Sequence, residues 1–244
     1  MSTRSPRVGG APGWPLVLYF HHVHPRVDHY TALTEDAFRR ALETVLTHFG
    51  PALDPALVGP RIAPPDAPTV LFTFDDGYRD NLTRAAPLLA EFGVGAALFC
   101  VTDRIDEASS LTDGVRARLA PRRTYLDWAE TARMVGLGHT LGAHTRTHPH
   151  LTELTRAQAE REVAGSFDRI TAVLGRYPRS FAYPYGEVAH SSVLPDSVLG
   201  FGTVKSPARP WDSAPHEIRR TYLPTDLPET WVSLAEDWKR QWYG

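Results

Sequence analysis

Two short segments of the sequence carry residue types that could bind a metal ion and activate water. The apolar run 70–74 leads into two adjacent carboxylates, Asp75 and Asp76, and then a glycine. Further along the chain, His144 and His148 lie four residues apart. Carboxylate and imidazole groups are ligands for divalent metals, and a second carboxylate beside such a site can act as a general base. The two segments together predict a hydrolytic metal centre.

The two adjacent carboxylates carry like charges, and something must offset their repulsion if both lie in one pocket. Neighbouring side chains at the end of a strand begin on opposite faces, but a turn can bring both into one pocket. Two carboxylates at close range repel each other, and the pKa of one rises unless a dication keeps both ionised. We therefore expect one of the pair to be a metal ligand and the other the base. Taken alone, Asp-Asp-Gly is equally typical of an ordinary turn at a strand end.

The histidine pair does not follow the pattern of a helical zinc site. Pro149 follows His148 directly, and residues 138–142 are typical of a short buried strand that enters a loop. No glutamate follows His144, so the His-Glu-x-x-His pattern, which carries its own base, is absent. The base must come from the carboxylate pair. Of the 11 histidines, five are interpreted as having no role in the site: His29, His48, His139, His150 and His190.

A third segment, Phe181 to Gly186, reads Phe-Ala-Tyr-Pro-Tyr-Gly and is typical of a strand that ends in a turn. With this segment, the chain resembles the polysaccharide deacetylase family, the metal-dependent carbohydrate esterases of family four with a NodB-homology domain. The resemblance is carried by motifs that occur in order along most of the chain. These motifs lie at 72–78, 97–99, 125–128, 142–151, 181–186 and 200–202.

The resemblance implies a role for each matching position. Asp75 corresponds to the general base, and the backbone N–H of Tyr185 corresponds to the oxyanion donor. One divalent metal ion is implied, with zinc as the first choice and Co²⁺, Ni²⁺ or Mn²⁺ as alternatives. Its ligands correspond to Asp76, His144 and His148. Three further residues are assigned to substrate binding: Trp128, Tyr183 and Pro184.

The chain departs from many family members at the residue that holds the catalytic carboxylate. Those members carry an arginine two residues before the proline of the third motif, where this chain has Ala182. The poly-N-acetylglucosamine deacetylase branch, which shares the Phe-Ala-Tyr-Pro-Tyr-Gly motif, has a late arginine in an extended segment. The resemblance to that branch implies that Arg220 steadies Asp75, with Arg219 as the alternative.

The general acid is the second departure. Many family members carry Leu-x-His near the C-terminus, and this chain has no such motif there. In the same branch the acid histidine lies near the N-terminus, in a stretch that corresponds to residues 18–23 here. The resemblance implies that His21 is the acid, and a shift of one residue in the alignment would give this role to His22.

The residues that carry this chemistry follow segments that are typical of buried strands. Strands are expected at 16–20, 70–74, 96–101, 140–143 and 179–183, with further extended segments at 201–204 and 218–223. Helices are expected at 34–49, 81–92, 125–135 and 156–174, with a last helix from 228. Residues 51–68 are expected to be irregular, and residues 103–121 a loop or short helix.

This alternation of strands and helices predicts an α/β protein with a parallel sheet, in which strand carboxyl ends form the active face. The resemblance narrows the fold to a distorted, incomplete (β/α) barrel. A single catalytic domain is expected over residues 16–244, after a flexible tail over residues 1–15.

Composition narrows the possible partners. The hydrophobic content of 42% is typical of a globular protein, and the net charge of −2 gives no reason to expect a nucleic acid. The single cysteine, Cys100, ends an apolar strand and is expected to be a small buried residue. We find no signal-peptide pattern and no apolar run long enough to span a membrane, which predicts a cytoplasmic location. The oligomeric state is left open.

Two further groups of side chains are interpreted as surface or packing features. The arginines at 116, 118, 122 and 123 are expected to form a solvated face, with contact to an anionic substrate as the alternative. A helical stripe near the C-terminus is expected to pack against the core, with sugar stacking or a dimer interface as the alternatives; it contains Trp231, Leu234, Trp238 and Trp242.

The leading functional hypothesis is hydrolysis of an N-acetyl group on an amino sugar. One alternative is deacylation of an amide or ester on a small biosynthetic intermediate, which a cytoplasmic location favours. The other is a carbohydrate-binding protein without catalysis, and the intact set of carboxylates and histidines argues against it.

Overall fold

Six parallel strands form the sheet that carries the candidate functional residues. The computed structural model describes residues 6–119, 124–188 and 193–244. Within these residues the strand order is β1-β4-β5-β6-β7-β8, with parallel pairing throughout. The strands are β1 (Leu16–Phe20), β4 (Val70–Phe74), β5 (Ala96–Cys100), β6 (Thr140–Ala143), β7 (Ser180–Ala182) and β8 (Leu199–Phe201). A second, two-stranded sheet pairs β2 (His22–Val23) with β3 (Ala32–Leu33).

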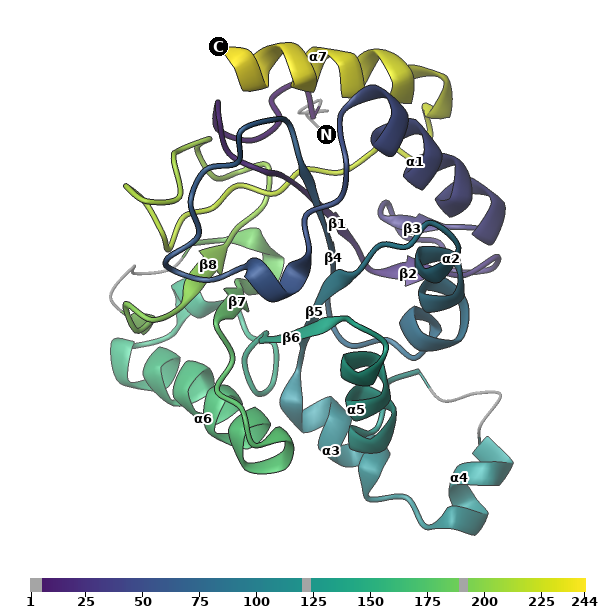
Figure 1. Ribbon diagram of the computed structural model, residues 1–244. Coiled ribbons are helices and arrows are strands. Elements are labelled where there is room, and N and C mark those ends of the chain that lie inside the picture. Colours follow the sequence, from purple (N-terminus) through teal and green to yellow (C-terminus); the bar gives the residue numbers. More distant parts are fainter. Residues whose placement is uncertain (1–5, 120–123, 189–192) are drawn as a thin grey trace.

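The six-stranded sheet curls, and the helices lie around its outside (Figure 1). This arrangement confirms the predicted incomplete (β/α) barrel. The α-helices are α1 (Glu35–His48), α2 (Ala86–Glu91), α3 (Thr102–Ser109), α4 (Asp113–Leu119), α5 (Trp128–Gly136), α6 (Arg156–Leu174) and α7 (Trp231–Tyr243). The shorter helical turns are η1 (Pro55–Leu57), η2 (Asn81–Ala85, a π-helix), η4 (Leu151–Glu153), η5 (Pro184–Gly186) and η7 (Pro228–Thr230).

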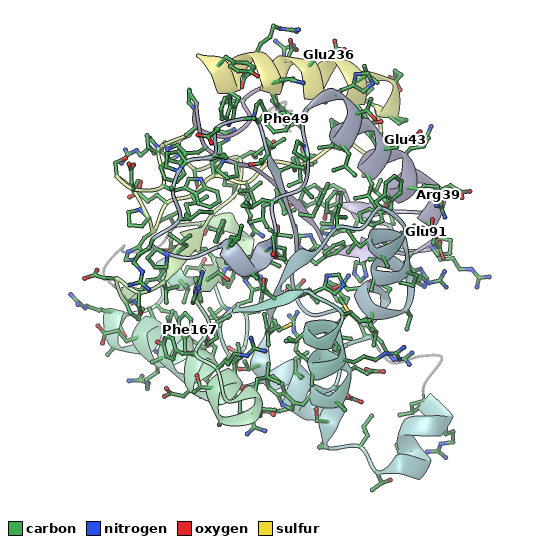
Figure 2. All side chains as sticks on the ribbon, viewed as in Figure 1. Arg39, Glu43, Phe49, Glu91, Phe167 and Glu236 are labelled. Carbon is green, nitrogen blue, oxygen red and sulfur yellow. The ribbon has the colours of Figure 1, made fainter. Side chains whose placement is uncertain are left out.

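Local sequence signals explain where the main helices begin. Thr34 accepts a hydrogen bond from the backbone of Ala37 at the start of α1, and Asp127 and Thr155 head capping boxes at α5 and α6. These side chains satisfy backbone N–H groups that a helix start leaves unpaired. On the outer surface, Arg39 of α1 and Glu91 of α2 form an ion pair and lie close together in Figure 2.

Most predicted elements agree with the structure. The strands at 16–20, 70–74 and 140–143 and the helix at 156–174 have the predicted bounds. The segment predicted as a loop or short helix at 103–121 instead contains two helices, α3 and α4. Of the basic stretch, Arg122 and Arg123 lie outside the described residues, as does His190.

The segment 218–221 fills the space between the two edges of the sheet without forming a regular strand. Ile218 bridges Phe201 at the end of β8, and Thr221 bridges Leu18 in β1. The backbone N–H of Thr221 donates to the Val17 carbonyl at 2.9 Å. The predicted extended segment is therefore held on both sides by isolated bridges, and Arg220 lies between them.

Both faces of the central strands are buried, which explains why their sequences are continuous apolar runs. Leu18 and Phe20 of β1 pack with α1 in the larger hydrophobic cluster. Val17 belongs to a second cluster that includes Phe99 and Trp211. The two clusters hold the strands from both sides, and the carboxyl ends of these strands carry the candidate site.

Helix α7 packs against α1 and the N-terminal segment. Trp231, Leu234 and Trp238 are buried, in agreement with the predicted packing stripe. The Trp238 indole donates to the Pro6 carbonyl at 2.9 Å, and Gly9 N–H donates to the Gln241 side chain at 3.0 Å. Residues 6–15 therefore make specific contacts, while the predicted flexible tail over residues 1–15 and the domain boundary at 16 stay predictions.

Cys100 is fully buried at the end of β5, as predicted. Among the described residues, no helix combines the length and apolar character needed to cross a membrane.

Candidate metal centre and active site

Asp76, His144 and His148 meet at the carboxyl edge of the sheet. One potential ligand atom from each residue lies within 4.8 Å of the other two. Asp76 Oδ1 is 3.3 Å from His148 Nε2 and 3.7 Å from His144 Nε2. One carboxylate and two imidazoles form a donor set that suits zinc and other first-row divalent ions. Three protein ligands also leave a coordination position for water.

A backbone hydrogen bond fixes the ring orientation of His144. Its Nδ1 lies 2.7 Å from the carbonyl of Ala182, which can only accept, so Nδ1 carries the proton. Neutral His144 then has its lone pair on Nε2, the atom that faces Asp76. This is how metal-binding histidines are commonly held.

Left-handed backbone conformations place the site residues. Four non-glycine residues of the described chain have positive φ: Asp76 (69°), Thr145 (64°), His148 (66°) and Tyr185 (58°). Such conformations are unfavourable for residues with a Cβ and concentrate at functional sites. The Thr145 hydroxyl accepts from the His148 backbone at 3.0 Å and so supports the turn between the two histidines.

The electrostatics of the cluster suit metal binding. Burial and the neighbouring His144 lower the pKa of His148 to about 4, so His148 is neutral near pH ~7. Burial alone would raise the pKa of Asp76, but His144, His21 and His148 together hold it below its usual value. An ionised carboxylate with neutral imidazoles is the state in which these groups bind metals.

Asp75 lies beside the cluster and is held by Arg220. The Arg220 guanidinium donates to both Asp75 oxygens, at 2.6 and 2.8 Å. It also donates to the Thr73 hydroxyl at 3.2 Å and to the Gly202 carbonyl at 3.0 Å, and it lies over the ring of Tyr19. Burial alone would raise the pKa of Asp75, but Arg220, with His144 and His21, lowers it to about 2. The carboxylate is therefore ionised and fixed in orientation.

Substitution of Arg220 by alanine should strongly destabilise the protein. Arg220 is fully buried, and removal of one partner from a buried ion pair typically costs about 3–5 kcal/mol. The depressed pKa of Asp75 stabilises the fold above the unfolded-state pKa of about 3.9, and this contribution is lost as pH falls through about 2. Urea unfolding of the metal-free protein between about pH 6 and pH 2 should show this acid-range loss in the wild type. A reduced loss is expected in Arg220→Ala, and an unchanged free energy of unfolding would contradict the prediction.

His21 follows β1 and lies next to the Asp75 strand. Phe20 pairs with Phe74, and the Asp75 N–H donates to the Phe20 carbonyl at 3.0 Å. The His21 imidazole lowers the pKa of both site carboxylates. Burial lowers the pKa of His21 itself to about 4, although both carboxylates act to raise it. Its Nδ1 contacts the Thr31 hydroxyl at 2.6 Å.

The neighbouring His22 has different contacts. Its Nδ1 lies 2.8 Å from the carboxylate of Asp80, and its ring stacks on Tyr78 with centroids 3.7 Å apart. The Asn81 side chain donates to the His21 carbonyl at 2.9 Å and so anchors the backbone between the two histidines. The two rings therefore have different partners, Thr31 for His21 and Asp80 with Tyr78 for His22, and the acid role of His21 stays a prediction.

Tyr185 lies beside the cluster of candidate metal ligands. Its ring meets that of His148 edge-on at 4.7 Å and stacks on His150 at 3.5 Å. His150, interpreted from the sequence as having no role, is therefore the stacking partner of this tyrosine. Tyr185 adopts its left-handed conformation in the turn η5, which follows β7.

The residues assigned to substrate binding are mostly packed inside. Tyr183 and Pro184 are buried, and the Tyr183 hydroxyl has no hydrogen-bond partner within the described part of the chain. Trp128 is buried, and its indole donates to Asp106 at 2.7 Å. These three residues are thus buried, Trp128 with a hydrogen bond to Asp106, and their substrate role stays a prediction.

Sequence reasoning did not predict two polar neighbours of the centre. Arg104 of α3 reaches Asp76 Oδ1 at 3.4 Å and lies over the ring of Tyr125 at 5.1 Å. Thr31 is buried against His21. Neither residue lies in a recognisable motif, so only the fold could reveal these contacts.

The curled parallel sheet and the Asp-His-His cluster at its carboxyl edge agree with the arrangement expected for the NodB type of carbohydrate esterase. The sequence profile described as polysaccharide deacetylase matches residues 63–203, more than half of the chain. The chain belongs to the polysaccharide deacetylase family.

Individual relatives are more distant. YxkH of Bacillus subtilis (strain 168), assigned by name to the polysaccharide deacetylases, is 29% identical over 137 residues. The match covers 56% of this chain and 44% of YxkH, so this chain spans less than half of that relative.

Two solved structures share the fold along almost the whole chain. The deacetylase PplD of Streptococcus pyogenes, in complex with acetate, has a TM-score of 0.73 at 20% identity and covers 93% of this chain and 98% of its own. IcaB from Ammonifex degensii has a TM-score of 0.71 at 20% identity and covers 94% and 100%. At this identity the two structures establish the fold alone.

Proposed function

We propose that this chain is a metal-dependent hydrolase that removes an N-acetyl or related acyl group from an amino sugar or acetylated saccharide. The observation that carries the proposal is the Asp76, His144 and His148 cluster with an ionised Asp75 beside it. Membership of the polysaccharide deacetylase family supports the substrate class. The cluster fits one divalent ion, and zinc suits its nitrogen and oxygen donors best.

When bound, the metal would polarise the acyl carbonyl and lower the pKa of water. Asp75 is the base that takes a proton from the attacking water, because Arg220 keeps its carboxylate ionised and oriented. The backbone N–H of Tyr185 donates to the oxygen that becomes negative as the carbonyl carbon turns tetrahedral. This donor role rests on the resemblance and on the position of Tyr185 beside His148.

His21 supplies the proton for the leaving amine. The C–N bond breaks with its electron pair on nitrogen, the nitrogen takes the proton from His21 Nε2, and the Nε2–H electron pair stays on the imidazole. The reference pKa of an imidazole is about 6.5, but burial lowers the pKa of His21 to about 4. The free protein therefore holds His21 neutral. The imidazole must gain its Nε2 proton before the C–N bond breaks, and the proton that Asp75 takes from the attacking water supplies it.

The proposal is tested by acetate release from the zinc-loaded chain. N-acetylglucosamine, its oligomers, O-acetylated sugars and non-sugar amides or esters form the substrate panel. We expect release from the N-acetylated amino sugars. Release only from non-sugar substrates would favour the small-molecule deacylase, and sugar binding without release would favour a carbohydrate-binding protein.

His21→Ala should slow amide hydrolysis far more than hydrolysis of an activated aryl ester. An amine needs a proton to depart, whereas an aryl oxide does not, so only the amide depends on the acid. We expect a loss of roughly 10²-fold or more on the amide and only a small loss on the ester. His22→Ala is the matched neighbour, and it should not reproduce this selective loss. Equal slowing of both substrates in His21→Ala would contradict the acid role.

A further inference from the structure

His21 is one end of a chain of side-chain hydrogen bonds that no sequence motif indicates. Its Nδ1 lies 2.6 Å from Thr31 Oγ1, and the same oxygen lies 2.9 Å from His29 Nδ1. The backbone N–H of Thr31 also donates to His29 Nδ1, at 3.3 Å. The three residues lie on the segment between β1 and β3, which includes the short strand β2. His29 was interpreted from the sequence as having no role. In the structure, two successive hydrogen bonds through the Thr31 hydroxyl connect it to His21.

The direction of each hydrogen bond follows from what the groups can donate. Because a backbone N–H can only donate, His29 Nδ1 must accept and carries no proton. The Thr31 hydroxyl has a single proton, and its 2.9 Å contact with the bare His29 Nδ1 must use that proton. The remaining contact of the Thr31 oxygen, to His21 Nδ1, must then be one in which the oxygen accepts. Neutral His21 therefore has its proton on Nδ1 and its lone pair on Nε2.

We propose that Thr31 and His29 are positioning residues that keep the proton on His21 Nδ1 and leave Nε2 as the nitrogen that exchanges protons with substrate. The inference rests on the proposed acid role of His21 for its catalytic consequence. The hydrogen bond at one ring nitrogen sets the tautomer and orientation of an imidazole and so decides which nitrogen faces the reaction. A hydroxyl achieves this without adding charge.

Backbone hydrogen bonds hold this segment independently of the side-chain hydrogen bonds among His21, Thr31 and His29. The His21 N–H donates to the Thr31 carbonyl at 3.4 Å, and the Ala32 N–H donates to the His29 carbonyl at 2.8 Å. The ring of His29 also contacts that of His21, with centroids 4.6 Å apart. Thr31 is 2% exposed, and valine has nearly its shape, so Thr31→Val removes the hydroxyl while the backbone contacts remain.

The test reads the tautomer directly in the zinc-loaded protein. Long-range ¹H–¹⁵N correlation spectra of histidine-labelled protein distinguish protonated from bare ring nitrogens, and His21→Gln assigns the His21 signals. We expect the Nδ1–H tautomer in the wild type and in Thr31→Ser, which keeps a hydroxyl. Thr31→Val and His29→Phe should show a mixture of tautomers. A wild-type Nε2–H tautomer, or an unchanged tautomer in Thr31→Val, would overturn the proposal.

The relative rates of amide and ester hydrolysis provide a second measurement, which would not change if Thr31 had a purely structural role. Thr31→Val should lower kcat for an amide about tenfold to a hundredfold with KM little changed, because a misplaced catalytic group costs rate more than binding. An activated aryl ester should be slowed much less, and Thr31→Ser should recover the amide rate. Equal slowing of amide and ester would contradict the positioning role.

The spectra test the tautomer of His21 and the kinetics test its role in catalysis, so failure of one proposal can be told from failure of the other. If the wild type hydrolyses no amide, the proposed function fails, while the tautomer measurement still decides the state of His21. If Thr31→Val does not fold, the wild-type tautomer and the His29→Phe spectrum decide the inference.

Discussion

His144→Ala should abolish tight zinc binding and reduce deacetylation to the background rate. His144 supplies one of three ligand atoms, and its Nε2 is already aimed by the bond from Nδ1 to the Ala182 carbonyl. Loss of an outer partner of a metal ligand typically costs about 10–100-fold in affinity or activity. Loss of the ligand itself should exceed that range. Zinc content by mass spectrometry and affinity by titration calorimetry measure the effect.

The matched control is His48→Ala. His48 lies at the end of α1, where it pairs with Glu236 of α7 at 3.3 Å, remote from the strand ends of the site. This variant should keep one zinc per chain. Dialysis of the wild type against a chelator should also remove activity, and added zinc should restore it. A His144→Ala protein that binds zinc with wild-type affinity would exclude His144 as a ligand.

Asp75→Asn should retain the metal while turnover falls by roughly 10²–10⁴, the contribution typical of a general base. Asparagine keeps the shape of aspartate but cannot accept the proton of water. Burial would oppose a charge at this position, and Arg220 nevertheless lowers the pKa of Asp75 to about 2, so wild-type Asp75 is ionised at the working pH. The variant leaves Arg220 buried without its counter-charge, so a lower melting temperature is also expected.

Asp76→Asn is the control for Asp75→Asn. The two residues are adjacent, and Asp76 is the one within reach of both ligand histidines. Asp76→Asn should lose metal and activity together, whereas Asp75→Asn should lose activity alone. Turnover is measured as acetate release, and metal is counted in the same samples. If Asp75→Asn loses the metal and Asp76→Asn keeps it, the two assigned roles are exchanged.

The elements with strong local patterns could be predicted from the sequence. The strands at 16–20 and 70–74 are short, mainly apolar runs that end at a polar residue, and the strand at 140–143 lies between two histidines. Helix α6 carries its own capping box at Thr155. The candidate metal ligands were found because they follow such strands, and carboxyl ends of parallel strands share one edge. The hydrophobic pattern of the segment 103–121 was weaker and predicted a loop or short helix, whereas the structure has two helices there.

The pairing of Asp75 with Arg220 shows the limit of local patterns. The two residues are 145 positions apart, and resemblance to a family branch, not spacing, suggested the pair. The backbone of the segment that carries Arg220 pairs with β8 and β1 through isolated bridges, because the segment fills the gap between the sheet edges. No periodicity predicts that gap, since it depends on how far the whole sheet curls.

The sequence by itself determined the residue types of the centre, the strands that deliver them and the family. Tertiary structure decided that His144 turns Nε2 toward Asp76, through the contact of its Nδ1 with the Ala182 carbonyl, and that the Thr31 hydroxyl contacts His21 Nδ1. It also decided that His21 is buried enough to lower its pKa to about 4. Burial and hydrogen-bond partners arise from contacts between distant segments, and the local order of residues does not encode such contacts.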